Sequence, residues 1–305
     1  MLRPLALTFS DPNSELSWNP VEDVQRLLHY EFMRNAFEAG TIIAVVAGIV
    51  GYFVVLRQLS FASHALSHIG YAGATGAVLV GITPLYGLLA FSVGSAMAMG
   101  GLGRRIYNRD VAIGVVMAAS LGLGQLFVSR YRGGGNSTQS YSILFGQILG
   151  ISGHDIAVTL GVSAVTLVLM AALYRPLLFA SVDEDVAEAR GVPTRAVGIA
   201  FLGVIGLAVA QSVQVTGILL IFCLLVAPAA VAQRLSSRPG LGLGLSVLLA
   251  VAFTWAALAV TYFQGSLPMS FLLTAIAFAA YSAARGVGWL LERRGRQTRG
   301  PAYAG

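Results

Sequence analysis

Nine apolar stretches, each close to the length of a membrane-crossing helix and uncharged except for Asp155 at the edge of one, recur along this chain of 305 residues. A helix needs about 20 predominantly apolar residues to cross the hydrocarbon core of a bilayer. Lipid offers no hydrogen-bond partners, so the backbone must satisfy its own polar groups there. The sequence therefore predicts an all-α, polytopic membrane bundle of eight or nine transmembrane helices. The stretches are 39–56, 61–80, 85–102, 111–129, 155–174, 197–214, 216–233, 241–263 and 268–284.

The composition agrees with a membrane protein and excludes one class of function. Hydrophobic residues make up 56% of the chain, charged residues 10%, and the mean hydropathy is +0.77. All 19 basic residues are arginine. A P-loop needs a lysine to reach the nucleotide phosphates, so any ATP that drives this protein must bind to another chain. The apolar stretches carry no paired carboxylates and no nucleophile with a base. We therefore expect a protein that is not an enzyme and has no bound cofactor and no nucleic-acid partner.

The distribution of arginine predicts an orientation in the membrane. Short cytoplasmic loops accumulate arginine, and short external loops do not. If the first stretch runs from outside to inside, fourteen arginines fall on the cytoplasmic side and five remain outside. This predicts an external N-terminus and a cytoplasmic C-terminus.

The chain divides into three parts. Residues 1–38 are expected to form an external tail followed by an amphipathic helix, Pro20 to Glu38, that lies along the interface. Residues 39–284 form the transmembrane domain, and residues 285–305 form a basic cytoplasmic tail. Most connections are short, but 130–154 and 175–196 are long.

Two histidines, His64 and His68, stand four residues apart in the second stretch. Residues at this spacing lie on one face of a helix, close enough for two imidazoles to share a cation. An ionisable residue inside a membrane is costly and usually marks a transport path. Three interpretations stay open on spacing alone. The pair is a metal relay, a proton relay, or two neutral side chains that hydrogen-bond to neighbouring helices.

The long connection 175–196 falls on the cytoplasmic side in this orientation. A short helix from Asp183 to Arg190 is expected in it, acidic at its start and stopped by Gly191 and Pro193. At the external end of the fifth stretch, Asp155 is expected to cap the helix, and the neighbouring His154 to be exposed.

The run from Val54 to Leu79, VVLRQLSFASHALSHIGYAGATGAVL, resembles a signature of the bacterial ABC-type zinc and manganese permease family. The family pattern there is Arg-x-Leu-Ser-Phe-x-Gly-Asp-Ala-Leu-Ser-His. His68 matches the histidine of this pattern, and His64 stands where the pattern has aspartate. Further similar runs follow in order, at 110–124, 142–152, 182–192 and 216–232.

This resemblance implies the membrane-spanning permease of an ATP-driven importer in the bacterial inner membrane. The implied partners are a cytoplasmic ATP-binding subunit, an extracytoplasmic metal-binding protein and a second copy of the permease in a homodimer. His64 and His68 are implied ligands of the transported ion. Two imidazoles make a softer and less anionic set than imidazole with carboxylate, which favours Zn²⁺ over Mn²⁺. The connection 175–196 is the implied coupling loop, which docks on the ATPase through Asp183, Glu184, Asp185, Glu188, Ala189 and Gly191.

Two other functions remain compatible with the sequence. An ABC permease for a metal chelate or vitamin has a wide cavity and little need for ion ligands, so its uptake would survive loss of both histidines. A proton-coupled secondary metal carrier would use the same histidines for proton transfer. It would work without an ATPase and would stop when the proton gradient is collapsed.

Overall fold

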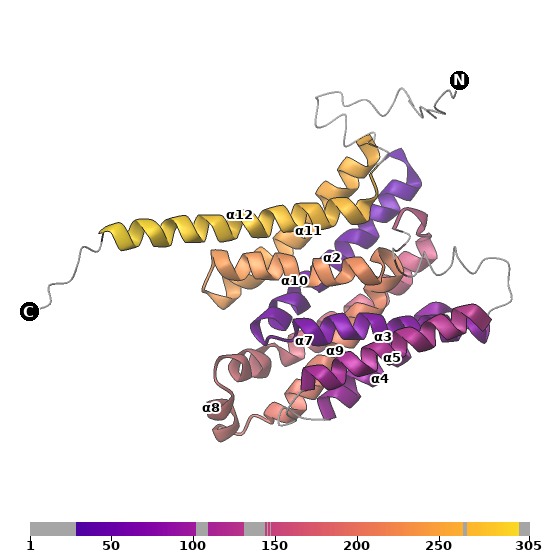
Figure 1. The fold of residues 1–305 in the computed structure, drawn as a ribbon, viewed down its shortest axis with the longest axis horizontal. Coiled ribbons are helices and arrows are strands. Elements are labelled where there is room, and N and C mark those ends of the chain that lie inside the picture. The colour runs from indigo at the N-terminus through magenta and orange to yellow at the C-terminus, as the bar shows by residue number, and fades with distance from the viewer. Residues whose placement is uncertain are drawn as a thin grey trace, which may run out of the picture.

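The computed structural model describes residues 29–101, 109–130, 144, 146, 148–264 and 267–298, and every regular element in these ranges is helical. The predicted all-α membrane bundle is therefore confirmed (Figure 1). Two of the described elements are short, η1 (Ile148–Gly150) and α8 (Glu184–Ala189). The long helices are α2 (Glu31–Leu56), α3 (Ser60–Leu79), α4 (Pro84–Gly101), α5 (Arg109–Arg130), α7 (Gly153–Val182), α9 (Thr194–Thr216), α10 (Ile218–Leu235), α11 (Pro239–Gln264) and α12 (Met269–Thr298).

The nine long helices of the described part follow the nine predicted stretches in order. Six of them are long and apolar enough, by length and composition, to cross a membrane: α2, α5, α7, α9, α11 and α12. The other three are α3, which carries many polar side chains, and α4 and α10, which have 18 residues each. The expected eight or nine transmembrane helices are therefore roughly consistent with the nine long helices of the described residues.

Three predicted boundaries differ, because helices continue beyond the apolar stretches. Residues 31–38 form the first turns of α2 rather than a separate interfacial helix, and residues 20–28 of that prediction lie outside the described residues. α7 continues through Pro176 to Val182, which shortens the loop predicted for 175–196. α12 continues to Thr298, into the predicted tail. An apolar stretch indicates the part of a helix that contacts lipid. The backbone hydrogen bonds of the helix can continue beyond that part, so the helix can be longer than the stretch.

The helices α2 and α9 form the centre of the bundle. In the most apolar 18-residue segment of each of these helices, 67% is buried inside the bundle. The corresponding share for α5 is 11%. α2 packs against α10 and α11 on one side and against α7 and α9 on another. α4 packs against α9, and α3 packs against both α4 and α5. Figure 1 accordingly shows α3, α4 and α5 together on one side of the bundle, with α10, α11 and α12 on the other.

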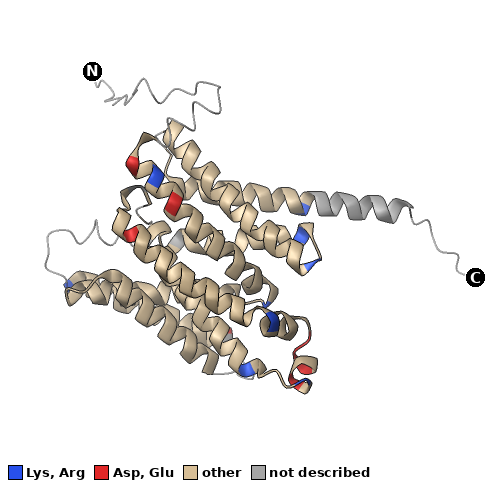
Figure 2. Cartoon of the chain, turned by 180° about the vertical axis from the view of Figure 1, so that it is seen from behind, with Lys and Arg blue, Asp and Glu red and all other residues tan. Residues whose placement is uncertain are grey.

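Charged residues gather toward the two ends of the bundle and leave an uncharged layer between them (Figure 2). This is the distribution that a hydrocarbon layer requires. The two ends differ, because the end that carries α8 holds most of the described arginines. Arg34 and Arg130 lie at the opposite end, while the α8 end has Arg57, Arg175, Arg190, Arg195, Arg234, Arg238 and Arg285.

Glycine lets the helices approach more closely than any other residue would permit. A Cβ atom at Gly73 of α3 would collide with the carbonyl oxygen of Gly87 on α4, and the reverse also holds. A Cβ atom at Gly48 of α2 would lie 2.6 Å from the Cα atom of Val247 on α11. Helices in lipid gain no hydrophobic driving force from association, so close van der Waals packing between small residues holds them together.

We predict that Gly73→Ala destabilises the protein, because the new methyl group would collide with the backbone of α4. Overpacking of this kind typically costs about 1–3 kcal/mol. Gly94→Ala is the matched control, since nothing lies within 4 Å of a Cβ atom there. Alanine is preferred over glycine in a helix by roughly 0.5–1 kcal/mol, so Gly94→Ala should be neutral or stabilising. Thermal unfolding of the purified proteins in one detergent measures both, and equal midpoints would contradict the close contact.

Candidate functional site

A tight reversal of the chain positions the start of α3. The Gln58 N–H donates to the Val55 carbonyl at 3.1 Å and the Leu59 N–H to the Val54 carbonyl at 2.8 Å. These two bonds form a Schellman motif, which ends α2. Gln58 has a φ of 57°, which is uncommon for a residue with a side chain. α3 therefore begins at Ser60, immediately after a turn whose backbone is fully hydrogen-bonded.

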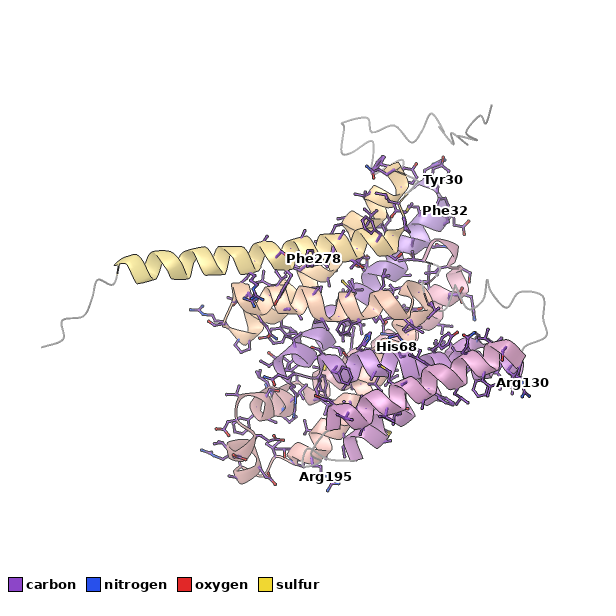
Figure 3. The ribbon with its side chains drawn as sticks, in the orientation of Figure 1. Tyr30, Phe32, His68, Arg130, Arg195 and Phe278 are labelled. Atoms are coloured by element: carbon purple, nitrogen blue, oxygen red, sulfur yellow. The ribbon has the colours of Figure 1, made fainter. Side chains whose placement is uncertain are left out.

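His64 and His68 lie one above the other on α3, about 6 and 12 Å along the helix from Ser60. Their ring centroids are 4.6 Å apart, and the ring planes meet at 84°. The ring of Phe222 on α10 lies 4.7 Å from that of His64. Figure 3 places His68 in the middle of the bundle, between Arg130 at one end and Arg195 at the other. The structure thus brings the predicted pair together where α3 faces α10.

The two histidines differ from the rest of α3 in their exposure. From residue 62 to residue 75, they are the two positions that are not buried. The surface of α3 is therefore closed by packing everywhere in this segment except along the histidine face. A small ion or water can approach the two rings there.

The polar partners of the two rings are incomplete. In each ring Nδ1 is buried and has no hydrogen-bond partner among the described residues. The nearest hydroxyls on α3 are engaged along their own helix, because Ser63 donates to the Ser60 carbonyl and Ser67 to the Ser63 carbonyl. Leaving a buried polar atom without a partner is costly. The described contacts therefore do not favour two histidines satisfied by neighbouring helices.

The described residues contain no cluster of three or more His, Cys, Asp or Glu side chains that could hold a metal ion. A structural zinc site uses about four protein ligands. The half-buried thiol of Cys223, next to Phe222 on α10, does not complete such a set. Two imidazoles alone provide a weak site, and weak binding is what permits release during transport.

Ser92 of α4 joins the histidine turn to a second helix. Its side chain is fully buried, and Oγ donates to the carbonyl of Leu66 at 3.4 Å. Leu66 lies between the two histidines in sequence. From α9, a Cβ atom at Gly206 would come within 2.9 Å of the Ser92 carbonyl oxygen. The helices α3, α4 and α9 therefore meet at this serine, which sequence analysis did not single out because an isolated serine in an apolar stretch carries no signal.

The helix predicted from Asp183 to Arg190 is confirmed as α8. The Asp183 carboxylate caps it by accepting from the Val186 N–H at 2.9 Å. At the other end, the Gly191 N–H donates to the Glu188 carbonyl and the Val192 N–H to the Ala187 carbonyl. Gly191 has a φ of +83°, which the Schellman motif requires. Six residues were predicted to contact a partner here. All six lie on α8 or its caps: Asp183, Glu184, Asp185, Glu188, Ala189 and Gly191.

The structure does not place α8 beside the histidines, but a series of contacts links them. α8 packs on α7 and on the start of α9. Near that start, Arg195 donates to the Gly101 carbonyl at the end of α4, at 3.3 Å. A Cβ atom at Gly100 would lie 3.0 Å from the side chain of Ile199 on α9. α9 is thus in contact with α4 both at the α8 end and deeper in the bundle, at Ser92.

Asp155 has the predicted capping role at the start of α7. Ser152 is the N-cap residue, and Asp155 completes a capping box by accepting from the Ser152 N–H at 3.2 Å. His154 is exposed, as predicted. Neither residue belongs to the histidine site.

Comparison with known proteins gives consistent matches over most of the chain. Residues 29–285 match the model of the ABC 3 transport family. The manganese transport system membrane protein MntC of Halalkalibacterium halodurans is 30% identical over 240 residues, which cover 78% of this chain and 80% of that protein. The manganese import system permease protein ScaB of Streptococcus parasanguinis is 30% identical over 212 residues, which cover 69% and 75% of the two chains.

Two solved structures share the fold. PsaBC from Streptococcus pneumoniae, in complex with Fab, aligns with a TM-score of 0.77 and 26% identity over 87% of this chain and 94% of that one. An inward-facing ABC transporter of the metal-chelate type aligns with a TM-score of 0.68 and 17% identity, over 89% and 91%. This second likeness shows the fold alone. Together with the family match, these findings confirm the resemblance seen in the sequence: the chain belongs to the ABC 3 transport family and is a multi-pass permease subunit, not an enzyme.

Proposed function

We propose that the protein is the membrane-spanning subunit of an ATP-driven importer of a divalent metal ion, and that His64 and His68 bind the ion inside the bundle. The observation that carries this proposal is the histidine pair. Its rings lie 4.6 Å apart on the one accessible face of an otherwise packed segment of α3. The names of the relatives MntC and ScaB, which refer to manganese transport and import, support a metal as the cargo.

The preferred ion in this proposal is Zn²⁺ rather than Mn²⁺. Its support is the chemistry of two imidazoles, which are softer ligands than carboxylates and carry no charge when neutral. The family pattern has aspartate where His64 stands, and the relatives above are named for manganese. Residue 64 is therefore the position at which the metal selectivity of this chain would differ from that of a permease with the family pattern.

The proposed setting is the bacterial inner membrane, with the N-terminus outside and the C-terminus in the cytoplasm. The concentration of arginines at the α8 end supports a cytoplasmic α8. An ATP-binding subunit docks there, on the exposed acidic side chains of Asp185 and Glu188. An extracytoplasmic metal-binding protein delivers the ion at the opposite end, and two copies of the permease form the complete transporter.

Energy from the ATPase reaches the histidines mechanically in this proposal. A force on α8 is transferred to α9, which follows it in the chain. Arg195 and Gly206 of α9 are in contact with α4, and Ser92 of α4 is bonded to the histidine turn of α3. The three helices would then move together relative to α10, whose Phe222 lies against His64. ATP binding and release shift the bundle between two access states.

We predict that His64→Ala with His68→Ala strongly lowers metal uptake. The expected loss exceeds about tenfold, because changes to outer-shell groups alone typically cost 10–100-fold in metal affinity. The measurement is ATP-dependent uptake of radioactive zinc into proteoliposomes that contain the complete transporter. His154→Ala is the matched control, since that histidine is exposed in the first turn of α7 and does not belong to the histidine site.

Full uptake by the double variant would instead favour a permease for a metal chelate or vitamin. Uptake that needs a proton gradient and no ATP would favour a secondary carrier.

We predict that His64→Asp raises manganese uptake relative to zinc uptake severalfold, because a carboxylate is a harder and more anionic ligand than imidazole. Competition between the two ions in the same vesicles gives the ratio directly. His68→Asp is the comparison at the position where the family pattern keeps histidine. An unchanged ratio in the His64→Asp variant would remove the proposed basis for zinc selectivity.

We predict that Gly191→Val lowers uptake while ATP hydrolysis by the partner subunit continues. The φ of +83° at this position is strained for a β-branched residue, so the end of α8 would shift. Gly191→Asn is the control, because asparagine tolerates the left-handed region. Protein levels in the membrane are measured for both variants. If transport by the valine variant is undiminished, α8 is not the coupling element.

A further inference from the structure

An arginine side chain contacts a tyrosine hydroxyl group at the α8 end of the bundle, and a second arginine follows that tyrosine by one helical turn. Arg234, in the last turn of α10, donates Nη2 to the hydroxyl oxygen of Tyr281 on α12 at 3.4 Å. Its guanidinium carbon lies 5.3 Å from the centre of the same ring. Arg285 follows Tyr281 by four positions, or about one turn, on α12, so its positive charge lies on the same side of that helix. Arg238, in the connection from α10 to α11, adds a third positive charge at this end.

These positive charges have no carboxylate partner in the described part of the chain. Within those residues, Arg234, Arg238 and Arg285 form no ion pair with Asp or Glu, and all three side chains are exposed. The Tyr281 hydroxyl is uncharged and cannot neutralise two guanidinium groups. Bringing like charges together raises the electrostatic energy, which a bound anion would lower. A phosphate group fits best, because its oxygens match the planar donor fork of arginine.

The position of the cluster favours a lipid over a soluble phosphate. The apolar part of α12 runs from Met269 to Gly286, so Arg285 lies where hydrocarbon gives way to headgroups. Phe271 and Phe278 precede Arg285 at intervals of seven residues, which places all three on one side of the helix. Both phenylalanines are exposed, Phe278 to 72% (Figure 3). An acyl chain would contact these two rings while its phosphate contacts the arginines.

We propose that Arg234, Tyr281 and Arg285, together with Arg238 from the connection after α10, bind the phosphate headgroup of an anionic phospholipid in the leaflet at the α8 end. This site is independent of the histidine pair and of the proposed metal. α12 also continues past the other helices to Thr298 (Figure 1). The sequence of this last part includes Arg293, Arg294 and Arg296. Clusters of basic residues next to a spanning helix attract anionic lipid.

The test measures which lipids remain bound to the purified full-length protein. Wild-type protein and variants are equilibrated with phosphatidylglycerol and phosphatidylcholine of identical acyl chains, and native mass spectrometry counts the retained lipids. We expect the wild type to prefer phosphatidylglycerol. The variant R234Q/R285Q should lose this preference by roughly 25-fold, because each arginine near an anionic surface contributes about a factor of five. R234K/R285K should keep most of it, and R130Q, at the opposite end of the bundle, should keep all of it.

Three results would overturn the proposal. The first is an unchanged lipid preference in R234Q/R285Q. The second is displacement of bound phosphatidylglycerol by inorganic phosphate, which would assign the site to a soluble anion. The third is loss of a permease dimer in R234Q/R285Q without loss of bound lipid, which would assign the surface to a second copy of the chain. Tyr281→Phe leaves both arginines in place and should weaken the preference less than R234Q/R285Q, so it tests the site even if the double variant folds poorly.

Discussion

The close contact of α3, α4 and α9 is the constraint on which the rest of the structure depends. Lipid supplies no force that drives apolar helices together, so these three associate only where their backbones can meet. Gly73 and Gly87 allow this between α3 and α4, and Gly206 allows it between α9 and α4 at Ser92. With α5 covering another side of α3, the histidine face is left toward α10. The accessibility of the two rings is thus a result of packing elsewhere on the same helix.

In the proposed transporter, the ion-binding histidines and the contact through which energy enters lie on different helices. A chain without lysine has no P-loop, so work from ATP has to enter through a contact with another protein. In the proposal that contact is the capped helix α8, which carries exposed acidic residues. The histidines lie on a different helix, inside the bundle. The path from one to the other passes through α9, whose 23 residues extend for about 35 Å. A tightly packed set of helices can transmit a displacement over that length, whereas a loosely packed set would absorb it.

The accuracy of the sequence predictions varied with the range of the interactions involved. Nine long helices matched nine apolar stretches because lipid forces the backbone to hydrogen-bond within each segment. α8 was predicted with its two ends, because the acidic residues at its start and Gly191 at its end act on backbone groups only a few positions away. Residues 31–38 were predicted to be helical, but as a separate helix and not as the start of α2. The end of α7 at Val182 was missed because Arg175 and Pro176 indicate a loop, and the end of α12 at Thr298 was missed because its last turns are polar. Pro176, expected to lie in a loop, is accommodated within α7.

The sequence by itself determined the class of the protein, the order of its helices and the common face of His64 and His68. Each of these follows from periodicity, length or capping, which operate within one or two helical turns. The tertiary structure alone decided that Phe222 lies against His64, that Ser92 ties α4 to the histidine turn, and that Arg234 lies against Tyr281. These partners are 158, 26 and 47 residues apart in the chain. Which distant side chains meet depends on how the whole bundle packs, and no local pattern in the sequence encodes that.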